Sequence, residues 1–305
     1  MKVLVTGGAG FIGSHVVDVL VESGYDVIVI DNLSNGKKEN VNKKAKFYKE
    51  DITSKTLKLV FKKEKPDFVS HQAAQINVRH SIKNPVFDAE NNILGSINLL
   101  ELCKDFSVKK VVYASSGGAI YGNPEYLPCD EKHPIKPISP YGVSKFAVEL
   151  FLNYYYQTFG LSYCALRYSN VYGPRQDPNG EAGVVAIFTN NLLNNKQCII
   201  NGDGKQTRDF VYVKDVAKVN LLALEKKCKA CALNIGSGEE TSINELYKKI
   251  SGLVGSNKPC VHGPEIKGEV NRIYLDIKMA EKGLGWKPEF DLDKGLKETS
   301  GWFRK

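Results

Sequence analysis

A tyrosine and a lysine stand four residues apart in the segment Tyr141-Gly142-Val143-Ser144-Lys145. At this spacing, both side chains lie on one face of a helix. A free tyrosine has a pKa of about 10, which is too high for an effective base at neutral pH. A neighbouring ammonium favours the phenolate. The pair therefore predicts a general base, Tyr141, with Lys145 as its electrostatic partner, although the same spacing also occurs in ordinary surface pairs.

The first residues of the chain are suited to binding a dinucleotide. An apolar strand after Met1 runs into Gly7, Gly10 and Gly13, where a helix is expected to start. Close backbone approach there lets amides and a helix N-terminus hold a pyrophosphate without a basic side chain. The next expected strand ends at Asp31, eighteen residues after Gly13. An acid at about this distance takes the ribose hydroxyls and repels a 2′-phosphate, so NAD is favoured over NADP. The alternative is an ordinary strand–turn–helix.

The elements around these residues alternate between strand and helix. Strands are expected over 26–30, 68–70, 110–114 and 164–167, and helices over 84–104 and 141–159. This alternation predicts an α/β fold with a Rossmann-like, doubly wound parallel sheet. After about Ser169 the pattern becomes irregular. The segment 210–213, a helix from Lys214 and a strand over 232–235 are expected to return to the first sheet.

Two domains are expected from this change of pattern. Residues 1–170, with about 208–235, form the NAD-binding domain, and residues 171–207 and 236–305 form a smaller C-terminal substrate-binding domain.

Composition predicts a cytoplasmic protein. The chain has 305 residues, of which 42% are hydrophobic, and no apolar run approaches the roughly 18 residues that span a membrane. No signal peptide is expected before the first strand. Seven scattered cysteines favour a reduced, cytosolic protein. The only C-x-x-C, Cys228 with Cys231, is interpreted as structural rather than metal-binding or redox-active, and no metal is expected.

The net charge of +8 does not indicate a nucleic-acid partner. Only six of the 42 basic residues are arginine, and the lysines are spread over expected helix faces and loops. No stripe of basic and aromatic residues appears, so a solvated surface is the better interpretation.

With these motifs in place, the chain resembles the extended short-chain dehydrogenases/reductases and, among them, the UDP-glucose 4-epimerases. The matching segments are 6–13, 31–33, 51–52, 71–74, 92, 115–122, 141–145, 167–175 and 208–213. The resemblance implies that an NAD-bound enzyme oxidises carbon 4 of a UDP-sugar transiently. The oxidised nicotinamide, like the Lys145 ammonium, favours the phenolate of Tyr141. Tyr141 takes the proton of the 4-hydroxyl, the keto sugar swings about its diphosphate, and hydride returns to its other face. NAD is not consumed in this cycle.

The resemblance also implies a role for individual residues. Those expected to contact NAD are Gly7, Gly10, Phe11, Ile12, Asp31, Asn32, Asp51, Ile52, Ala73, Ala74, Asn92, Ser115, Tyr141, Lys145 and Tyr168. Those expected to contact the UDP-sugar are Ser116, Tyr141, Asn170, Arg208 and Lys267. The alternatives are purely structural roles: a turn asparagine for Asn170 and a surface ion pair for Arg208.

Two positions depart from the family's pattern. A serine or threonine is usual at position 117, where this chain has Gly117, so Ser116 is expected to supply that hydroxyl. An arginine is usual where Ile266 stands, and Lys267 is expected to replace it as a point charge without the planar fork of arginine. Catalysis is therefore assigned to Tyr141, Lys145 and Ser116.

These motifs are compatible with other functions as well. Dehydratases of this family carry an Asp-Glu pair where this chain has Gly118 and Ala119, and decarboxylases usually carry a glutamate at 119. Both absences favour epimerisation. A UDP-N-acetylhexosamine 4-epimerase is a further alternative, as is a non-catalytic NAD-binding or RNA-binding member, against which the intact Tyr141 and Lys145 argue.

A homodimer is expected as well. The expected helix over 141–159 has more apolar residues than one sheet contact needs: Phe146, Leu150, Phe151, Tyr154 and Tyr155. In the resembled family this helix and the one over 84–104 pair across a two-fold axis.

Overall fold

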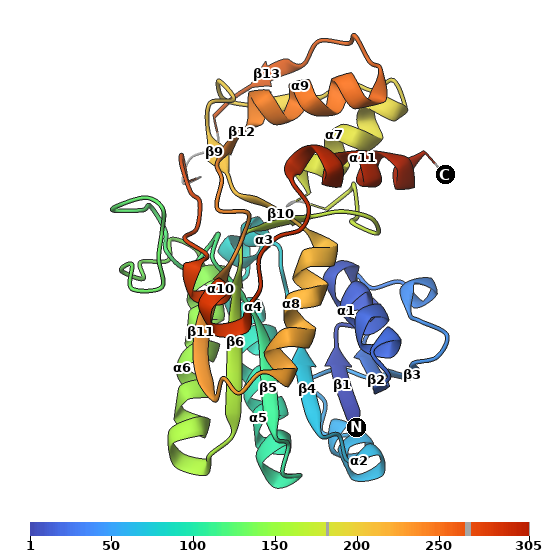
Figure 1. Cartoon of the computed structure of the whole chain (residues 1–305), viewed down its shortest axis with the longest axis vertical. Coiled ribbons are helices and arrows are strands. Elements are labelled where there is room, and N and C mark those ends of the chain that lie inside the picture. Colours follow the sequence, from blue (N-terminus) through green and yellow to red (C-terminus); the bar gives the residue numbers. More distant parts are fainter. Residues whose placement is uncertain (181–182, 266–269, 305) are drawn as a thin grey trace.

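A parallel sheet forms the centre of the computed structural model, which describes residues 1–180, 183–265 and 270–304 (Figure 1). Its seven described strands lie in the order β3-β2-β1-β4-β5-β6-β11. They are β1 (Lys2–Thr6), β2 (Asp26–Asp31), β3 (Lys46–Lys49), β4 (Phe68–His71), β5 (Lys110–Ser116), β6 (Ser162–Tyr168) and β11 (Ala230–Ile235). The prediction of a doubly wound, Rossmann-like sheet is confirmed.

Helices cover both faces of this sheet because each strand alternates apolar side chains between them. In β1, Val3 and Val5 pack with α1 (Phe11–Glu22) and α8 (Val213–Glu225) on one face. Leu4 packs on the other face, in the core formed with α2 (Leu57–Glu64), α5 (Gly95–Asp105) and α6 (Pro140–Phe159). The buried sheet thus fixes which ends of the strands meet at one edge.

The helix expected over 84–104 is three successive helical segments. They are α4 (Pro85–Ala89), a π-helical turn η2 (Glu90–Leu94) and α5, preceded by α3 (Val78–Lys83). Single π-turns inside helices are frequent at functional sites. Here the turn holds Asn92, which is buried.

Helices α7 (Val184–Leu193), α9 (Ile243–Val254) and α11 (Leu292–Phe303) enclose a separate apolar core. Small two-stranded sheets join β7 (Asn170–Tyr172) with β10 (Phe210–Tyr212), β9 (Thr207–Arg208) with β12 (Thr241–Ser242), and β8 (Ile199–Asn201) with β13 (Val261–Gly263). The remaining elements are η1 (Lys38–Asn40) and α10 (Lys278–Leu284).

The expectation that the segment 210–213 joins the main sheet is wrong. The segment 210–213 pairs with β7 instead, because its apolar side chains Phe210 and Tyr212 belong to the second core. The expected returns of the helix and of the strand over 232–235 are confirmed, as α8 packs on α1 and β11 pairs with β6. The domain boundaries stay a prediction.

The expectation that all cysteines are reduced is wrong for this structure. Cys228 and Cys231 form a disulfide, whereas Cys103, Cys129, Cys164, Cys198 and Cys260 are free. Over the ranges that the structure describes, there is no helix with the length and apolar character needed to cross a bilayer.

Candidate active site

The site lies where the strand order reverses between β1 and β4, the place where open α/β sheets bind ligands. The loops after these two strands touch. A Cβ atom on Gly7 would lie 2.7 Å from the backbone nitrogen of Ala73, and Gly7 has a φ of +69°. Only glycine fits both the space and the backbone angle. Ala73 therefore lies against the glycine turn, and the contacts of Ala73 and Ala74 with NAD stay a prediction.

The start of α1 also needs glycine and leaves its amides available. A Cβ atom on Gly13 would lie 2.1 Å from the carbonyl oxygen of Gly7. Gly10 caps α1 without any side-chain hydrogen bond to the first amides, and Phe11 and Ile12 form the first turn. Backbone amides that no side chain satisfies, beside a close-packed glycine turn, fit the pyrophosphate of a dinucleotide.

Acidic and amide groups gather at the end of β2. Asp31 is buried, and its carboxylate accepts bonds from the amides of Ala9 (3.0 Å) and Leu33 (2.8 Å). Asn32 donates to Asp51 over 2.6 Å. This brings together the residues predicted for the adenosine end, while Ile52 is buried beside them. The positions fit the nucleoside half of NAD.

Tyr141 and Lys145 lie in the first turns of α6, which starts after the capping residue Ser139. The Lys145 ammonium is buried and donates to the carbonyl oxygen of Ala114, at 2.9 Å. It lies 5.8 Å from the centre of the Tyr141 ring. Burial lowers the pKa of Lys145 to about 8, although the charge of Asp88 raises it. The predicted pair is thus brought to the end of β5.

In the protein alone, the pKa of Tyr141 lies above that of a free tyrosine. Burial raises this pKa to about 12, and the hydrogen bond with Ser116 lowers it only in part. The nearby ammonium therefore does not produce a phenolate in the protein alone. The physical reason is that removing a phenolate from water costs more than the Ser116 hydrogen bond returns.

The two serines at the end of β5 point in different directions. Ser116 makes a hydrogen bond with the Tyr141 side chain. Ser115 is buried and donates to Glu149, which forms an ion pair of 2.7 Å with Arg167. The structure thus places Ser116 beside the candidate base and Ser115 in the protein interior. Ser115 was expected to point away from the sugar, towards the cofactor or the core, and its contact with NAD stays a prediction.

Gly117 has a steric reason for lacking a hydroxyl. A Cβ atom there would lie 2.6 Å from Leu275 Cδ1 and 3.0 Å from the Arg167 carbonyl oxygen. The side chain of Leu275 fills the space that a serine at this position would need.

Sequence reasoning missed a buried carboxylate near Tyr141 and Lys145, that of Asp88. Asp88 accepts bonds from Gln75 Nε2 (2.8 Å) and Asn92 Nδ2 (3.2 Å), and the latter amide also reaches Ser144 Oγ (3.2 Å). Asn92, predicted to contact NAD, is therefore engaged with protein groups that link α4 to α6. Asn92 lies only four residues away in sequence, but Gln75 lies 13 residues away, and the burial of Asp88 depends on the whole fold.

The residues predicted for the diphosphate lie on the small sheets. Asn170 begins β7, and its amide donates to the carbonyl of Asp209 over 2.9 Å. Arg208 lies in β9 next to it and bonds the Thr207 carbonyl. Lys267 and Ile266 lie outside the described residues. Tyr168, predicted to contact NAD, is buried, and its hydroxyl accepts a bond from Asn220.

Asp209 is a second residue that sequence reasoning missed. Its buried carboxylate accepts bonds from Ser169 Oγ (3.0 Å), the Ser237 amide (2.7 Å) and the Leu275 amide (3.2 Å). Burial raises the pKa of this carboxyl despite these bonds. Asp209 thus holds the loop of Leu275 against the segment of Arg208.

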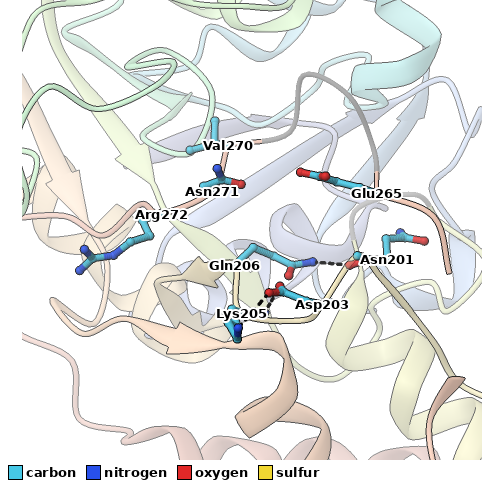
Figure 2. Close-up of a pocket in the computed structure, with 9 residues that line it drawn as sticks. Asn201, Asp203, Lys205, Gln206, Glu265, Val270, Asn271 and Arg272 are labelled. Atoms are coloured by element: carbon cyan, nitrogen blue, oxygen red, sulfur yellow. Dashed lines mark hydrogen bonds and ion pairs between the residues drawn. The ribbon is translucent and has the colours of Figure 1, made fainter. Parts of the chain in front are cut away.

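A polar cavity of about 510 Å³ opens beside the Arg208 segment (Figure 2). Gln206, two residues before Arg208, donates to the Asn201 carbonyl across its wall over 2.8 Å. The lining residues are Asn201, Gly202, Asp203, Lys205, Gln206, Glu265, Val270, Asn271 and Arg272. Such a cavity offers several hydrogen-bonding groups to a nucleotide-sized ligand.

Known proteins resemble the whole chain. Residues 3–236 match the NAD dependent epimerase/dehydratase family. A Methanocaldococcus jannaschii protein named, provisionally, as a UDP-glucose 4-epimerase is 54% identical over 99% of this chain and 98% of its own. A Thermotoga maritima UDP-glucose 4-epimerase solved with UDP-glucose is 48% identical, with a TM-score of 0.98. The match covers 100% of this chain and 99% of that chain. A Thermus thermophilus UDP-glucose 4-epimerase solved with NAD is 43% identical, with the same coverage and a TM-score of 0.94. The chain therefore belongs to the NAD dependent epimerase/dehydratase family.

Proposed function

We propose that this protein is an NAD-dependent UDP-glucose 4-epimerase that interconverts UDP-glucose and UDP-galactose in the cytoplasm. The observation that carries the proposal is the hydrogen bond between Tyr141 and Ser116 beside the buried Lys145, at the sheet edge where the glycine turn lies. That arrangement offers one acid/base group and one supporting hydroxyl to a sugar alcohol. Epimerisation through a keto sugar needs no further acid or base from the protein.

The protein's residues perform the proton transfer and the positioning. Tyr141 accepts the proton of the sugar 4-hydroxyl and later returns it, while Ser116 holds that oxygen. When bound, NAD supplies the acceptor for hydride from carbon 4 and then its donor. Lys145 is placed to hold the cofactor's ribose and to offset the charge on Tyr141. Asn170 and Arg208 hold the diphosphate, and the polar cavity that Gln206 lines takes the nucleoside. The keto sugar can then rotate while the rest of the substrate stays fixed.

A dehydratase or decarboxylase is less well supported. These reactions need a further acid or base beside the sugar, but positions 118 and 119 are glycine and alanine. Gly118 lies close to Asn170, because a Cβ atom on it would be 3.8 Å from the Asn170 amide oxygen. The neighbour of position 118 is therefore an amide and not a second titratable group.

The proposal is tested by incubating the protein with UDP-glucose, UDP-galactose and their N-acetyl forms, and by resolving the products with NMR. Interconversion of the first pair is expected. Turnover of the N-acetyl forms alone would identify a UDP-N-acetylhexosamine 4-epimerase, and loss of water or carbon dioxide from any substrate would contradict epimerisation.

NAD is expected to remain bound through purification. The cycle regenerates NAD, so rapid exchange has no use, and Asp31 disfavours the 2′-phosphate of NADP. Nucleotide released by acid from the purified protein should be NAD by mass spectrometry, at close to one per chain. Recovery of NADP would overturn the assignment of Asp31.

The protein is expected to form a homodimer through α6 and the segments that pack on it. Tyr155 was expected among the interface residues, but it is buried in the core and cannot contact a partner. Other apolar side chains remain exposed on α4, η2 and α6: Val86, Phe87, Leu94, Val143, Leu150 and Tyr154. Light scattering should give the mass of a dimer at micromolar concentration.

A matched pair of variants tests that interface. Leu150→Glu on α6 should give a monomer, because it places a charge among these apolar side chains. Leu59→Glu is the control, since Leu59 is exposed on α2, on a helix outside the proposed interface. A wild-type monomer, or equal effects of both variants, would refute the proposed surface.

A further inference from the structure

Three cysteines meet at the outer edge of the central sheet, away from the residues of the proposed reaction. Cys231 lies in the edge strand β11, directly opposite Cys164 in β6. Their sulfur atoms are 3.4 Å apart, and Cys228 completes a group whose sulfurs all lie within 4.8 Å of one another. The proposed epimerase reaction uses none of them.

We propose that, once the Cys228–Cys231 disulfide is reduced, these three sulfurs bind one thiophilic metal ion of the Zn²⁺ or Cd²⁺ type. A dithiol reductant gives two electrons and two protons to the disulfide and is itself oxidised to a disulfide. Three thiols then face one another. The metal ion replaces their three protons, which pass to solvent, and forms three metal–sulfur bonds.

The sulfur positions suit such an ion. Zinc–thiolate bonds measure about 2.3 Å, which puts the sulfurs of a tetrahedral site about 3.8 Å apart. The sulfurs of Cys164 and Cys231 are 3.4 Å apart, close to this value, and no pair of the three lies beyond 4.8 Å. The sulfurs of Cys228 and Cys231 are bonded to each other in the disulfide, so they must move apart to this spacing once it is reduced. Thiolate ligands select soft or borderline ions of this class over magnesium and calcium.

A buried cation beside the cluster lacks a counter-charge. The Lys110 ammonium donates to the carbonyl oxygens of Ala223 (2.9 Å) and Lys226 (2.6 Å), and no carboxylate pairs with it in the described part of the chain. A buried ammonium without a counter-ion is costly. Burial raises the pKa of the Cys164 thiol, and the nearby charge of Lys110 lowers it in part. Three thiolates on a divalent ion carry a net charge of −1, which is the counter-charge that Lys110 lacks.

The cluster also has a route of entry. Cys164 is fully buried, whereas Cys228 and Cys231 are half-buried and lie after the end of α8. An ion can therefore enter from the side of the 226–229 segment, and a solvent molecule can complete its fourth position. Binding would fasten this segment and β11 to β6, so the metal is expected to stabilise the edge of the sheet.

The first experiment titrates the full-length protein with Cd²⁺ after reduction by a dithiol and its removal under nitrogen. One Cd²⁺ per chain is expected, seen by sulfur-to-metal charge-transfer absorption in the ultraviolet and by a rise in Tm. The oxidised protein should show neither signal. Absence of the absorption in the reduced protein would overturn the proposal without touching the proposed epimerase activity, which needs none of these cysteines.

Variants then test the composition of the site. Cys164→Ser should weaken Cd²⁺ binding by at least about tenfold, as loss of even an outer partner costs this much. Cys260→Ser is the control, because Cys260 is free and outside the cluster. If Cys164→Ser fails to fold, Cys228→Ser at the half-exposed position must show the same loss.

The charge argument has its own pair of variants. Lys110→Met should weaken Cd²⁺ binding by about tenfold, whereas Lys226→Met, at an exposed lysine, should leave it unchanged. Wild-type affinity in both the Cys164 and Cys228 variants would overturn a three-sulfur site.

Discussion

Tyr141→Phe is expected to lower kcat by about 10²–10⁴-fold while UDP-sugar binding stays within a few-fold of wild type. The change removes one oxygen atom, the one that accepts the proton of the 4-hydroxyl in the proposed reaction. The ring itself remains, so the packing at the start of α6 is kept. Turnover is followed by NMR of the sugar products, and binding by calorimetry.

Tyr154→Phe is the matched control for this variant. Tyr154 lies on the same helix, and the proposed reaction does not use it. It belongs to the proposed dimer surface, and this variant keeps its ring there. It should keep wild-type turnover. A Tyr141→Phe enzyme that turned over within a few-fold of wild type would mean that another group is the base.

The raised pKa of Tyr141 bears on how that base works. With its pKa raised to about 12 by burial, Tyr141 is protonated at neutral pH in the protein alone. Lys145 lies 5.8 Å from the ring centre and bonds the Ala114 carbonyl instead of the phenol. Protein groups alone therefore do not prepare the base. The positive charge of oxidised NAD is the further contribution that the proposed mechanism requires.

Local patterns predicted much of the nucleotide-binding half. The glycine turn, α1 and Asp31 follow one another within a short segment, and each has a backbone or charge requirement that a residue type reveals. Tyr141 and Lys145 are likewise one helical turn apart. In such cases the sequence separation is small, so the spacing of residues is also their geometry.

Partners that are distant in sequence were not predictable in this way. Phe210–Tyr212 has the composition of a core strand, but which sheet it joins depends on β7, about 40 residues earlier. Asp88 and Glu149 become significant only through contacts across elements. The extent to which Tyr141 is buried, which raises its pKa in the protein alone, is likewise a property of the whole fold and not of the Tyr–Lys spacing.

Ser116→Ala is expected to lower kcat by about tenfold or more and to change KM less. Ser116 is hydrogen-bonded to Tyr141, and a bond to a charged group contributes about 1.5–3 kcal/mol. If this bond tightens as the proton moves, its loss appears in kcat rather than in substrate binding. Steady-state kinetics of the purified, NAD-loaded variant measure both constants.

Ser115→Ala separates this role from a structural one. Ser115 donates to Glu149 in the interior, so its loss should lower Tm and leave kcat within a few-fold of wild type. Gly117→Ser should not rescue Ser116→Ala, because Leu275 and the Arg167 carbonyl occupy the space that the new side chain would need. A neutral Ser116→Ala with an impaired Ser115→Ala would reverse the assignment. If both variants kept full turnover, Tyr141 would work without a supporting hydroxyl, and the glycine at 117 would mark a site that has dispensed with one.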